Sequence, residues 1–583
     1  MCYYIYIVMI VYGDYMKSNL VSNICSMDND EYKDSIIKNY EKYGFDEFSA
    51  FEIVKSMSID SIKKIIENHT LYSFTDRDLV KIVNLIDDVS YKEKIISNYK
   101  HYCFDLEDVA CVIVSFPDEY KKEFISNNKY KFDSYCKSII IDSISDEEYK
   151  YNIITKYKDY DLFYSDVSFI VSGFRDKDKY IFDLLSNYKE YGFDSNFIAS
   201  IVFLMSDKNK EKIVFDNKYD FSPLLLCDII SSVSDESKRI SIFNKLYSKG
   251  VFGDIKLTSS ICLPPEMTIG IEIESEGKNS RSINTLMLPS GWDIHLETTL
   301  NKGTEVVSPV LHSGDDKEIS KVCNLLSSLG QYVSSNCAGH IHIGANYFGD
   351  DVESFKILLE MFANLERIIF LISNSAGDIP REKAFKYAIP ITPKIVNKDI
   401  SFDSINDVNS FSLNIHNVQD MYSKPRYSSI NFENLSIPLQ NTIEFRTPNG
   451  TLDPNVWITN INLFGGLMVA AKNISMALKK SFANTTDDDK KNLYFYEKIK
   501  DVNISDLDRL KCLLNILPSS MNKDVYLERY EVNTTLVEKL RTGEILDTIS
   551  VFRPIRITTC SDELKEKVID GYKDYIKSNV SIR

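Results

Sequence analysis

The sequence lacks a basic run or stripe. Its 583 residues contain 68 lysines and arginines against 85 aspartates and glutamates, which gives a formal net charge of −17. A protein that binds nucleic acid needs a basic surface to neutralise the phosphates, so we expect no nucleic-acid partner. The acidic balance also argues against docking on an anionic membrane, while a local basic pocket for a nucleotide is still compatible with it.

Paired cysteine motifs are missing as well. Eleven cysteines are scattered from Cys2 to Cys560 without CxxC spacing. This pattern is typical of free thiols in a reducing compartment and predicts neither a disulfide framework nor a thiolate zinc site. We therefore expect a cytoplasmic protein.

The apolar segment Tyr3–Tyr12 is too short to cross a bilayer, since roughly 20 residues are needed. It also lacks the positive leading region and the small-residue cleavage site of a signal peptide. Two interpretations of residues 1–27 stay open: a membrane anchor, or a chain whose true start is Met16. We do not expect a membrane as a partner.

A period of about 30 residues runs through the first half of the chain. Each unit of this period contains two short segments in which apolar residues have helical spacing, as in Ile53–Ile59 and Tyr91–Tyr99. Such helices cannot bury their apolar faces alone, but stacked neighbours can. We therefore predict an all-α solenoid of helical repeats over residues 28–255. The period is marked by Phe45, Phe74, Phe104, Phe132, Phe163, Phe193, Phe221 and Phe252.

The predicted repeat array contains no evident chemistry. Solenoids present extended surfaces, so we expect the array to dock a protein partner or a protein substrate. The alternative is an inert scaffold or a self-association surface.

The character of the chain changes at Pro264–Pro265, where the helical pattern ends. Met267–Glu276 then alternates strictly between apolar and polar residues, which predicts a β-strand. Gly339–Ile343 and Thr442–Thr447 follow the same plan, and Gly303–Pro309 is a fourth candidate strand.

Longer apolar periodicities at Asp351–Ser373 and Trp457–Lys480 predict helices that cover the apolar face of a sheet. We therefore predict an α+β domain with an antiparallel sheet over residues 262–480. Gly465–Gly466 lies in the second helix and is expected to allow close packing. Residues 481–583 are predicted to be helical, with the acidic run Asp487–Asp489 in a solvated loop.

The polar faces of three strands carry Glu-x-Glu, His-x-His and Glu-x-Arg. A solvated sheet face explains any one of them, but two carboxylates at positions i and i+2 repel each other unless a cation screens them. Oxygen donors with an imidazole suit Mg²⁺ or Mn²⁺. The set therefore predicts divalent metal binding, and zinc fits less well because no thiolate or three-histidine set accompanies the pair.

Six short pieces of the chain, in this order, resemble the amidoligase family, which shares the fold of glutamine synthetase and glutamate–cysteine ligase. The resemblance covers residues from about Met267 to Asn473 and implies a glutamine synthetase-like antiparallel sheet domain. It says nothing of the repeat array. The pieces are residues 270–274, 303–309, 338–342, 426–431, 442–446 and 450–453.

The resemblance implies two divalent metal sites, which hold the phosphates of ATP against an acceptor carboxylate. One site would consist of Glu274, Glu297 and Glu305, and the other of Glu272, His340 and Glu444. The family usually carries an Asp-x-Ser-Leu element where this chain has Glu297–Leu300. Asp293 is therefore a rival to Glu297 as a ligand.

The implied activity is that of an ATP-dependent carboxylate–amine ligase, in which ATP converts a carboxylate to an acyl phosphate that an amine then attacks. Arg446, beside Glu444, and Arg426 would act on the transferring phosphoryl group, and His342 and Asn431 would bind the nucleotide. Arg381 and Tyr387 also stand where the family has an arginine and a tyrosine, and a structural role for them is equally open.

Both substrates, the carboxylate and the amine, could be small molecules, peptides or proteins, and the γ-carboxyl of glutamate is a guess by analogy. Two other functions compete with the ligase. One is a catalytically inactive adaptor that acts through its repeats, and the other is a metal-dependent hydrolase. Glu272, His340, Glu444 and Arg446 are all present, which favours an active enzyme, and a hydrolase would not need two arginines.

Overall fold

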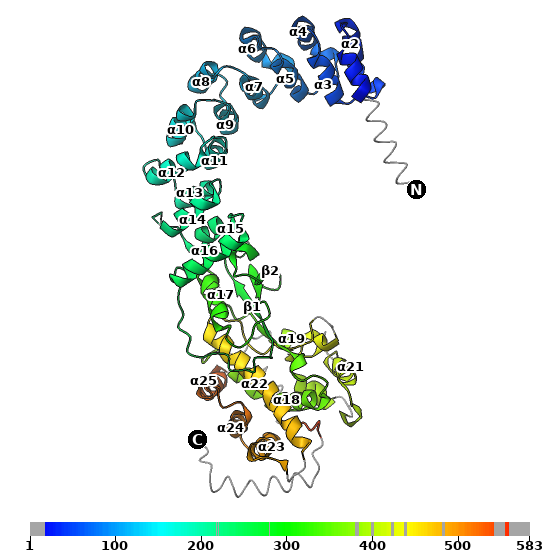
Figure 1. Ribbon diagram of the computed structural model, residues 1–583, viewed down its shortest axis with the longest axis vertical. Helices are drawn as coiled ribbons and strands as arrows, with labels where there is room; N and C mark the ends of the chain where they lie inside the picture. Colours follow the sequence, from blue (N-terminus) through cyan, green and yellow to red (C-terminus); the bar gives the residue numbers. More distant parts are fainter. Residues whose placement is uncertain are drawn as a thin grey trace. The chain divides into compact units, whose positions relative to one another are not determined.

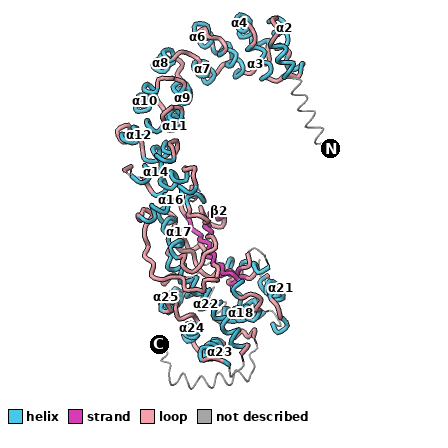
Figure 2. The backbone as a smooth tube through the Cα atoms, in the orientation of Figure 1, coloured by secondary structure: helices cyan, strands magenta, loops and turns pink. Residues whose placement is uncertain are grey.

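A computed structural model of the chain describes residues 18–216, 218–219, 221–278, 280, 282–378, 384–397, 402–420, 425–436, 440–480, 484–540 and 554–558. The predicted anchor at Tyr3–Tyr12 and the alternative start at Met16 lie outside these residues. The chain falls into two compact units, Met1–Phe221 and Ser222–Arg583. The first is helical, and the second contains an antiparallel sheet with helices (Figures 1 and 2). The predicted combination of an all-α part and an α+β part is thereby confirmed.

The first unit consists, in its described residues, of short helices joined by tight turns. Within it, α3, α5, α7, α9, α11 and α13 pack each against the next (Figure 1). The helices are α2 (Asp30–Ile37), η1 (Tyr40–Tyr43), α3 (Glu47–Lys55), α4 (Ile59–Glu67), η2 (His69–Leu71), α5 (Asp76–Asn84), α6 (Val89–Ser97), η3 (Tyr99–Tyr102), α7 (Leu106–Ile113), α8 (Asp118–Asn127), α9 (Ser134–Asp142), α10 (Glu147–Thr155), η4 (Tyr157–Tyr160), α11 (Tyr164–Ser172), α12 (Lys177–Asn187), α13 (Ser195–Val202) and α14 (Asp207–Asp216).

A recurring turn explains why phenylalanine and aspartate stand together in the sequence. Gly44 adopts a left-handed conformation with φ of 72° and ends a short 3-10 helix. Phe45 is then buried, and Asp46 caps α3 by accepting a hydrogen bond from the backbone N–H of Ser49. An aspartate at this position satisfies an N–H group that the helix itself cannot pair. Phe193 and Asp194 precede α13 in the same way.

Next to Phe163, which marks the period in the sequence, the buried residue is Leu162. Leu162 is 4% exposed and follows a left-handed residue, Asp161, whereas Phe163 is 68% exposed and occupies the N-cap position of α11, where its backbone N–H donates to Asp166. The backbone N–H of Leu162 donates to Tyr157, as that of Phe45 donates to Tyr40. Burial, and not aromatic character, therefore defines the recurring position.

Buried lysines connect neighbouring helix pairs of the first unit. Lys33 donates to the carbonyl of Ser56 at 2.9 Å, and Lys121 donates to that of Ser143 at 2.8 Å. The paired residues are 23 and 22 positions apart. Each lysine satisfies a carbonyl at the end of a helix in the next pair, so the ammonium groups are buried with hydrogen-bond partners.

The second unit contains the predicted sheet and the helices on its apolar face. Its elements are α15 (Pro223–Ser231), α16 (Glu236–Ser248), β1 (Ile269–Glu276), η5 (Thr285–Met287), β2 (Asp293–Glu297), β3 (Gly303–Val307), α17 (Asp316–Ser328), β4 (Gly339–Gly344), η6 (Ala345–Tyr347), α18 (Val352–Ile372), α19 (Ala384–Tyr387), α20 (Ile391–Asn397), η7 (Phe402–Ser404), α21 (Val408–Gln419), η8 (Pro425–Tyr427), β5 (Ile430–Asn431), η9 (Glu433–Ser436), β6 (Thr442–Phe445), α22 (Pro454–Leu478), α23 (Asp487–Ile499), α24 (Asp506–Ile516) and α25 (Asp524–Leu540). The domain limits drawn from the sequence, at residues 255, 262 and 480, stay predictions.

Six antiparallel strands form the sheet in the order β2-β3-β1-β4-β6-β5. The four predicted strands are present as β1, β3, β4 and β6, while β2 and β5 were not predicted. Ile269, Ile271 and Ile273 of β1 are buried on one face. On the same side of β6, Phe445 stacks on Phe464 of α22 with ring centroids 4.4 Å apart. The apolar face is thus covered, and the charged side chains lie on the opposite face.

Helix α22 is the one described helix that is long and apolar enough to cross a membrane. Of its most apolar stretch, 78% is buried inside the protein, and the helix packs against α18, α17 and α23. A Cβ atom at Gly466 would lie 2.8 Å from the Cε atom of Met521, and one at Gly465 would overlap Leu263. The predicted close packing at these glycines is confirmed.

The acidic run Asp487–Asp489 forms the first turn of α23, so its assignment to a solvated loop was wrong. Thr486 and Asp489 make a reciprocal capping box at this end of the helix. Carboxylates are favourable there because the first N–H groups of a helix carry a partial positive charge. Every cysteine in the described residues is a free thiol, as the scattered spacing predicts.

Candidate functional site

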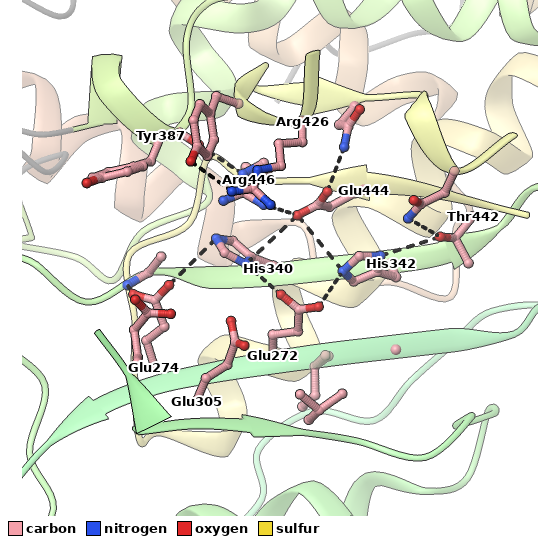
Figure 3. A pocket seen from close by; sticks show the side chains of 18 of the residues that line it. Glu272, Glu274, Glu305, His340, His342, Tyr387, Arg426, Thr442, Glu444 and Arg446 are labelled. Carbon is pink, nitrogen blue, oxygen red and sulfur yellow. Dashed lines mark hydrogen bonds and ion pairs between the residues drawn. The ribbon is translucent and has the colours of Figure 1, made fainter. Parts of the chain in front are cut away.

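The polar face of the sheet lines a cavity of about 860 Å³ in the second unit (Figure 3). Tyr387 also lines it, whereas Arg381 lies outside the described residues. Asp293, the rival of Glu297, is about half exposed and does not line the cavity. The structure brings together in this cavity all of the site residues expected from the resemblance: Glu272, Glu274, Glu297, Glu305, His340, His342, Arg426, Asn431, Glu444 and Arg446.

Strand register brings these side chains together. Glu272 of β1 lies directly opposite His340 of β4, and His342 lies opposite Glu444 of β6. On the other side of β1, Glu274 lies opposite Glu305 of β3. Directly opposed residues of antiparallel strands point to the same face of a sheet. Polar residues spaced by two in sequence therefore form a continuous cluster across four strands.

Glu272 bridges the two imidazoles. Its Oε2 atom lies 2.7 Å from Nδ1 of His340, and its Oε1 atom lies 3.1 Å from Nε2 of His342 (Figure 3). Burial alone would raise the pKa of Glu272, but the hydrogen bonds and charges of the two histidines hold it well below its usual range. Burial likewise lowers the pKa of His342, but Glu272 and Glu444 outweigh it and raise that pKa. Both partners therefore favour their charged forms.

Glu444 is buried and makes an ion pair with the guanidinium of Arg446. Its other oxygen accepts a hydrogen bond from Nδ2 of Asn431 at 2.8 Å. Burial acts to raise the pKa of Glu444, but the charge of Arg446 and of the two histidines lowers it. Nε of Arg446 also donates to the carbonyl of Tyr387 at 2.8 Å, which fixes the plane of the guanidinium.

Three glutamates meet at the other end of the cluster. Donor oxygens of Glu274, Glu297 and Glu305 lie within 4.8 Å of one another. The backbone N–H of Ala338 donates to Glu274 at 2.6 Å. Burial and the neighbouring carboxylates raise the pKa of Glu305 to about 8. The cluster thus has more negative charge than its buried position can hold without a proton or a cation.

The donor atoms form three overlapping groups. Glu274, Glu297 and Glu305 make one group, as expected from the resemblance. In the set expected as the second site, Nδ1 of His340 lies 2.7 Å from Glu272 and 3.9 Å from Glu444. Glu272 also joins Glu305 and His340 in one compact group, and joins His342 and Glu444 in another. His342, expected on the nucleotide, thus also lies where it could coordinate a metal, and its i+2 spacing from His340 is the signal for this.

The residues present fit a divalent cation. Among the described residues, Nε2 of His340 is buried and has no hydrogen-bond partner, and Nε2 of His342 faces a carboxylate oxygen of Glu272 at 3.1 Å. Imidazole nitrogens next to several carboxylate oxygens are a donor set that Mg²⁺ or Mn²⁺ accepts. Coordination would also relieve the repulsion among the glutamates.

One wall of the cavity is aromatic and basic. The rings of Tyr387 and Tyr427 meet edge to face with centroids 5.5 Å apart. The guanidinium of Arg426 lies 5.0 Å from the ring of Tyr427, and Nη2 donates to its hydroxyl at 3.0 Å. Tyr427 was not singled out from the sequence, although it follows Arg426 directly. Together with Arg446 this wall offers cationic groups opposite the carboxylates.

Comparison with known families identifies the region that contains the cavity. No curated protein matches the chain. Residues 272–468 match the family described as "Putative amidoligase enzyme". This segment contains most of β1, the rest of the sheet, α18 and much of α22, and it contains no helix of the first unit. The match agrees with the resemblance seen in the sequence, and the similarity of residues 272–468 to this family supports a ligase-type enzyme.

Proposed function

We propose that the second unit is an ATP- and divalent-metal-dependent ligase that joins a carboxylate to an amine through an acyl phosphate. The observation that carries this proposal is the pairing of Arg446 with Glu444 inside a cavity that also contains three groups of metal-competent donors. A hydrolase would need the metal donors alone. The arginine supports transfer of a phosphoryl group.

The residues that would hold Mg²⁺ or Mn²⁺ are the members of the three donor groups. When bound, the cations neutralise the phosphate oxygens of ATP. The carboxylate substrate attacks the γ-phosphorus, the bond to the β–γ bridging oxygen breaks, and ADP leaves. The amine then attacks the acyl carbon and loses a proton, and inorganic phosphate leaves with the former carboxylate oxygen. The overall reaction therefore consumes ATP, one carboxylate and one amine.

Arg446 stabilises the negative charge that spreads over the transferring phosphoryl group. Its orientation is set in advance by Glu444 on one side and the carbonyl of Tyr387 on the other. A donor fixed before the reaction contributes more than one that must reorganise. Arg426, at the edge of the same wall, is a second candidate for this role.

His342 and Asn431 are proposed to contact the nucleotide. His342 lies beside Thr442, with Nδ1 3.4 Å from Oγ1 of the threonine. Asn431 holds Glu444 and lines the cavity next to Glu433 and Asn434. Both side chains thus lie along the wall that runs from the donor groups to the start of β6.

The first unit is proposed to dock a protein partner or a protein substrate. Phe48, Tyr135 and Phe169 are 73%, 52% and 44% exposed on helices of this unit. Aromatic side chains are favoured at interfaces, where they provide a large contact area. Replacing Phe48 and Phe169 by serine should raise KM for a protein substrate and leave turnover of a small carboxylate unchanged. An equal effect of the two substitutions on the protein substrate and on the small carboxylate would contradict docking.

The ligase is tested with purified protein, ATP, Mg²⁺, a pool of amino acids and hydroxylamine, which traps an acyl phosphate as a hydroxamate. We expect ADP release and a hydroxamate with at least one carboxylate. Neither product across varied acceptors would contradict the ligase and favour an inactive adaptor that acts through its repeats. Hydrolysis that needs metal but no ATP would favour a hydrolase. Glu444→Gln should abolish ADP release while the protein stays folded.

A further inference from the structure

A buried carboxylate lies behind the basic wall of the cavity. Glu366 of α18 is 1% exposed and does not line the cavity. Its Oε1 atom accepts a hydrogen bond from the backbone N–H of Ile391 at 2.7 Å, and Oε2 accepts one from that of Thr392 at 2.9 Å. The hydroxyl of Ser429 also donates to Oε1. One side chain thus holds the start of α20 and the segment before β5.

A buried lysine holds the neighbouring serine. Lys394 of α20 is fully buried, and its ammonium donates to Oγ of Ser428 at 3.1 Å and to the carbonyl of Gln419 at 2.7 Å. Ser428 and Ser429 are themselves fully buried. Buried charges are unfavourable unless they are well paired, and apolar side chains of similar volume stabilise a core at least as well. Two buried ionisable side chains that bind two adjacent serines therefore point to a need for accurate placement.

The two serines connect directly to the wall of the cavity. The backbone N–H of Ser429 donates to Ile389, and that of Ile389 donates to Tyr427, at 2.8 and 2.6 Å. The backbone N–H of Arg446 donates to the carbonyl of Ser429 at 2.9 Å. Since Arg446 also binds the carbonyl of Tyr387, the wall residues are joined to the partners of Glu366 by a short chain of hydrogen bonds.

We propose that Glu366 is a positioning residue for phosphoryl transfer, assisted by Lys394: it holds Arg446 and the tyrosine wall in place against the metal-binding carboxylates. This inference rests on the proposed ligase function. Glu366 does not touch the substrate in this role. It acts through Ser429 and the backbone of Arg446, and so sets where the guanidinium meets the charge that develops in the transition state.

The same helix provides a matched control. Glu360 of α18 is also fully buried, and it accepts hydrogen bonds from the backbone N–H and the hydroxyl of Thr558 at 2.6 and 3.1 Å. It pairs with Lys500 at 2.7 Å. Its partners contribute nothing to the lining of the cavity. Loss of the Glu360 or the Glu366 carboxylate therefore removes similar hydrogen bonds, but only Glu366 supports the wall of the cavity.

Glu366→Gln changes the bonding without changing the size of the side chain. Both oxygens of Glu366 accept from backbone N–H groups, so the amide NH₂ of glutamine must face one of these donors. In Glu360→Gln the amide NH₂ must likewise face a donor, which is either Lys500 or the backbone N–H groups of Ile557 and Thr558. The comparison uses the full chain and measures binding of MgADP with and without aluminium fluoride, which mimics the phosphoryl group in transfer.

For Glu366→Gln we expect the affinity for MgADP to stay within about twofold of wild type. The gain in MgADP affinity on adding aluminium fluoride should fall at least about tenfold, and so should kcat. Glu360→Gln should lose similar thermal stability and retain both functions. Equal tightening in the two variants would overturn the positioning role. If Glu366→Gln does not fold, Ser429→Ala removes one bond of the same chain and should shift the same ratio in the same direction.

Hydrogen exchange separates this inference from the proposed function. Backbone amides of residues 426–431 and 443–447 should exchange faster in Glu366→Gln than in wild type, and at the wild-type rate in Glu360→Gln. Wild-type protein that binds no MgADP and releases no ADP would reject the ligase, and the exchange rates would still decide whether Glu366 holds the wall. Unchanged exchange in Glu366→Gln and Ser429→Ala would overturn the inference.

Discussion

Glu272 and His340 face each other across β1 and β4, with a carboxylate oxygen 2.7 Å from Nδ1 of the imidazole. The same carboxylate reaches His342, two residues further along β4. Glu272 is thus the only side chain in the described residues that belongs to both histidine-containing donor groups. Its position makes it the link between these two donor groups.

Glu272→Gln should weaken Mn²⁺ binding by more than the roughly 10–100-fold that changes in outer-shell partners cause. The amide is a poorer ligand and cannot hold both imidazoles in their present orientation. Calorimetric titration with Mn²⁺ measures the effect. Glu276→Gln is the control, since Glu276 lies on the same strand, is buried and does not line the cavity. Equal losses in the two variants would show that charge alone, and not ligation, explains the binding.

Glu305 should make the stability of the metal-free protein depend on pH. Its pKa is raised from the ordinary value of 4.5 to about 8, chiefly by burial and then by the neighbouring glutamates. The folded state therefore binds more protons than the unfolded state between these values. The free energy of unfolding should fall as pH rises through this range.

The same shift predicts that divalent cations bind more tightly as pH rises towards 8, because the bound proton must leave. Urea unfolding in EDTA and Mn²⁺ titrations between pH 6 and 8.5 test both trends. Glu305→Gln should remove the contribution of this group, so the difference between wild type and the variant isolates it from that of His342. If stability and Mn²⁺ affinity depended on pH in the same way in wild type and in Glu305→Gln, the assignment of these trends to Glu305 would be contradicted.

Much of the sheet could be predicted from the sequence because alternation is a local property. Ile269, Ile271 and Ile273 already identify the buried face of β1, and the opposite face follows from the pleat. Strand β2 has no such pattern, since both faces are partly exposed, and β5 has only two residues. Pairing with β3 and β6 makes them strands, and pairing is not encoded locally.

The walls of the cavity were harder to predict from the sequence than the residues that could bind a metal in it. Glu-x-Glu and His-x-His are unusual enough to be noticed, and their register then brings them together. Tyr427 and Glu366 carry no such signal. A glutamate in an amphipathic helix is ordinarily solvated. That Glu366 is buried against α20 depends on packing between segments distant in the chain.

Arg446→Lys should lower kcat by about 100-fold with little change in KM for ATP, because a lysine cannot keep the fixed, planar donor geometry of the guanidinium. The ammonium would still compensate the charge of Glu444, so the fold should persist. ADP release at saturating ATP measures the effect. Arg426→Lys should have a smaller effect, since Arg426 is exposed. A larger loss at Arg426 would assign the phosphoryl group to that arginine.

A last prediction concerns the register of the helical unit. Leu162→Ala should lower the free energy of unfolding by about 2–5 kcal/mol, the range for a buried leucine, because it leaves a cavity between helices. Phe163→Ala should change it by about 0.5 kcal/mol or less, since its side chain is 68% exposed and the cap at this position uses backbone and Asp166. Urea unfolding followed by circular dichroism compares the two. The sequence period, which is marked by Phe163, would give the reverse order of the two effects. A larger effect of Phe163→Ala would therefore reject Leu162, the residue after the left-handed Asp161, as the buried position of this turn.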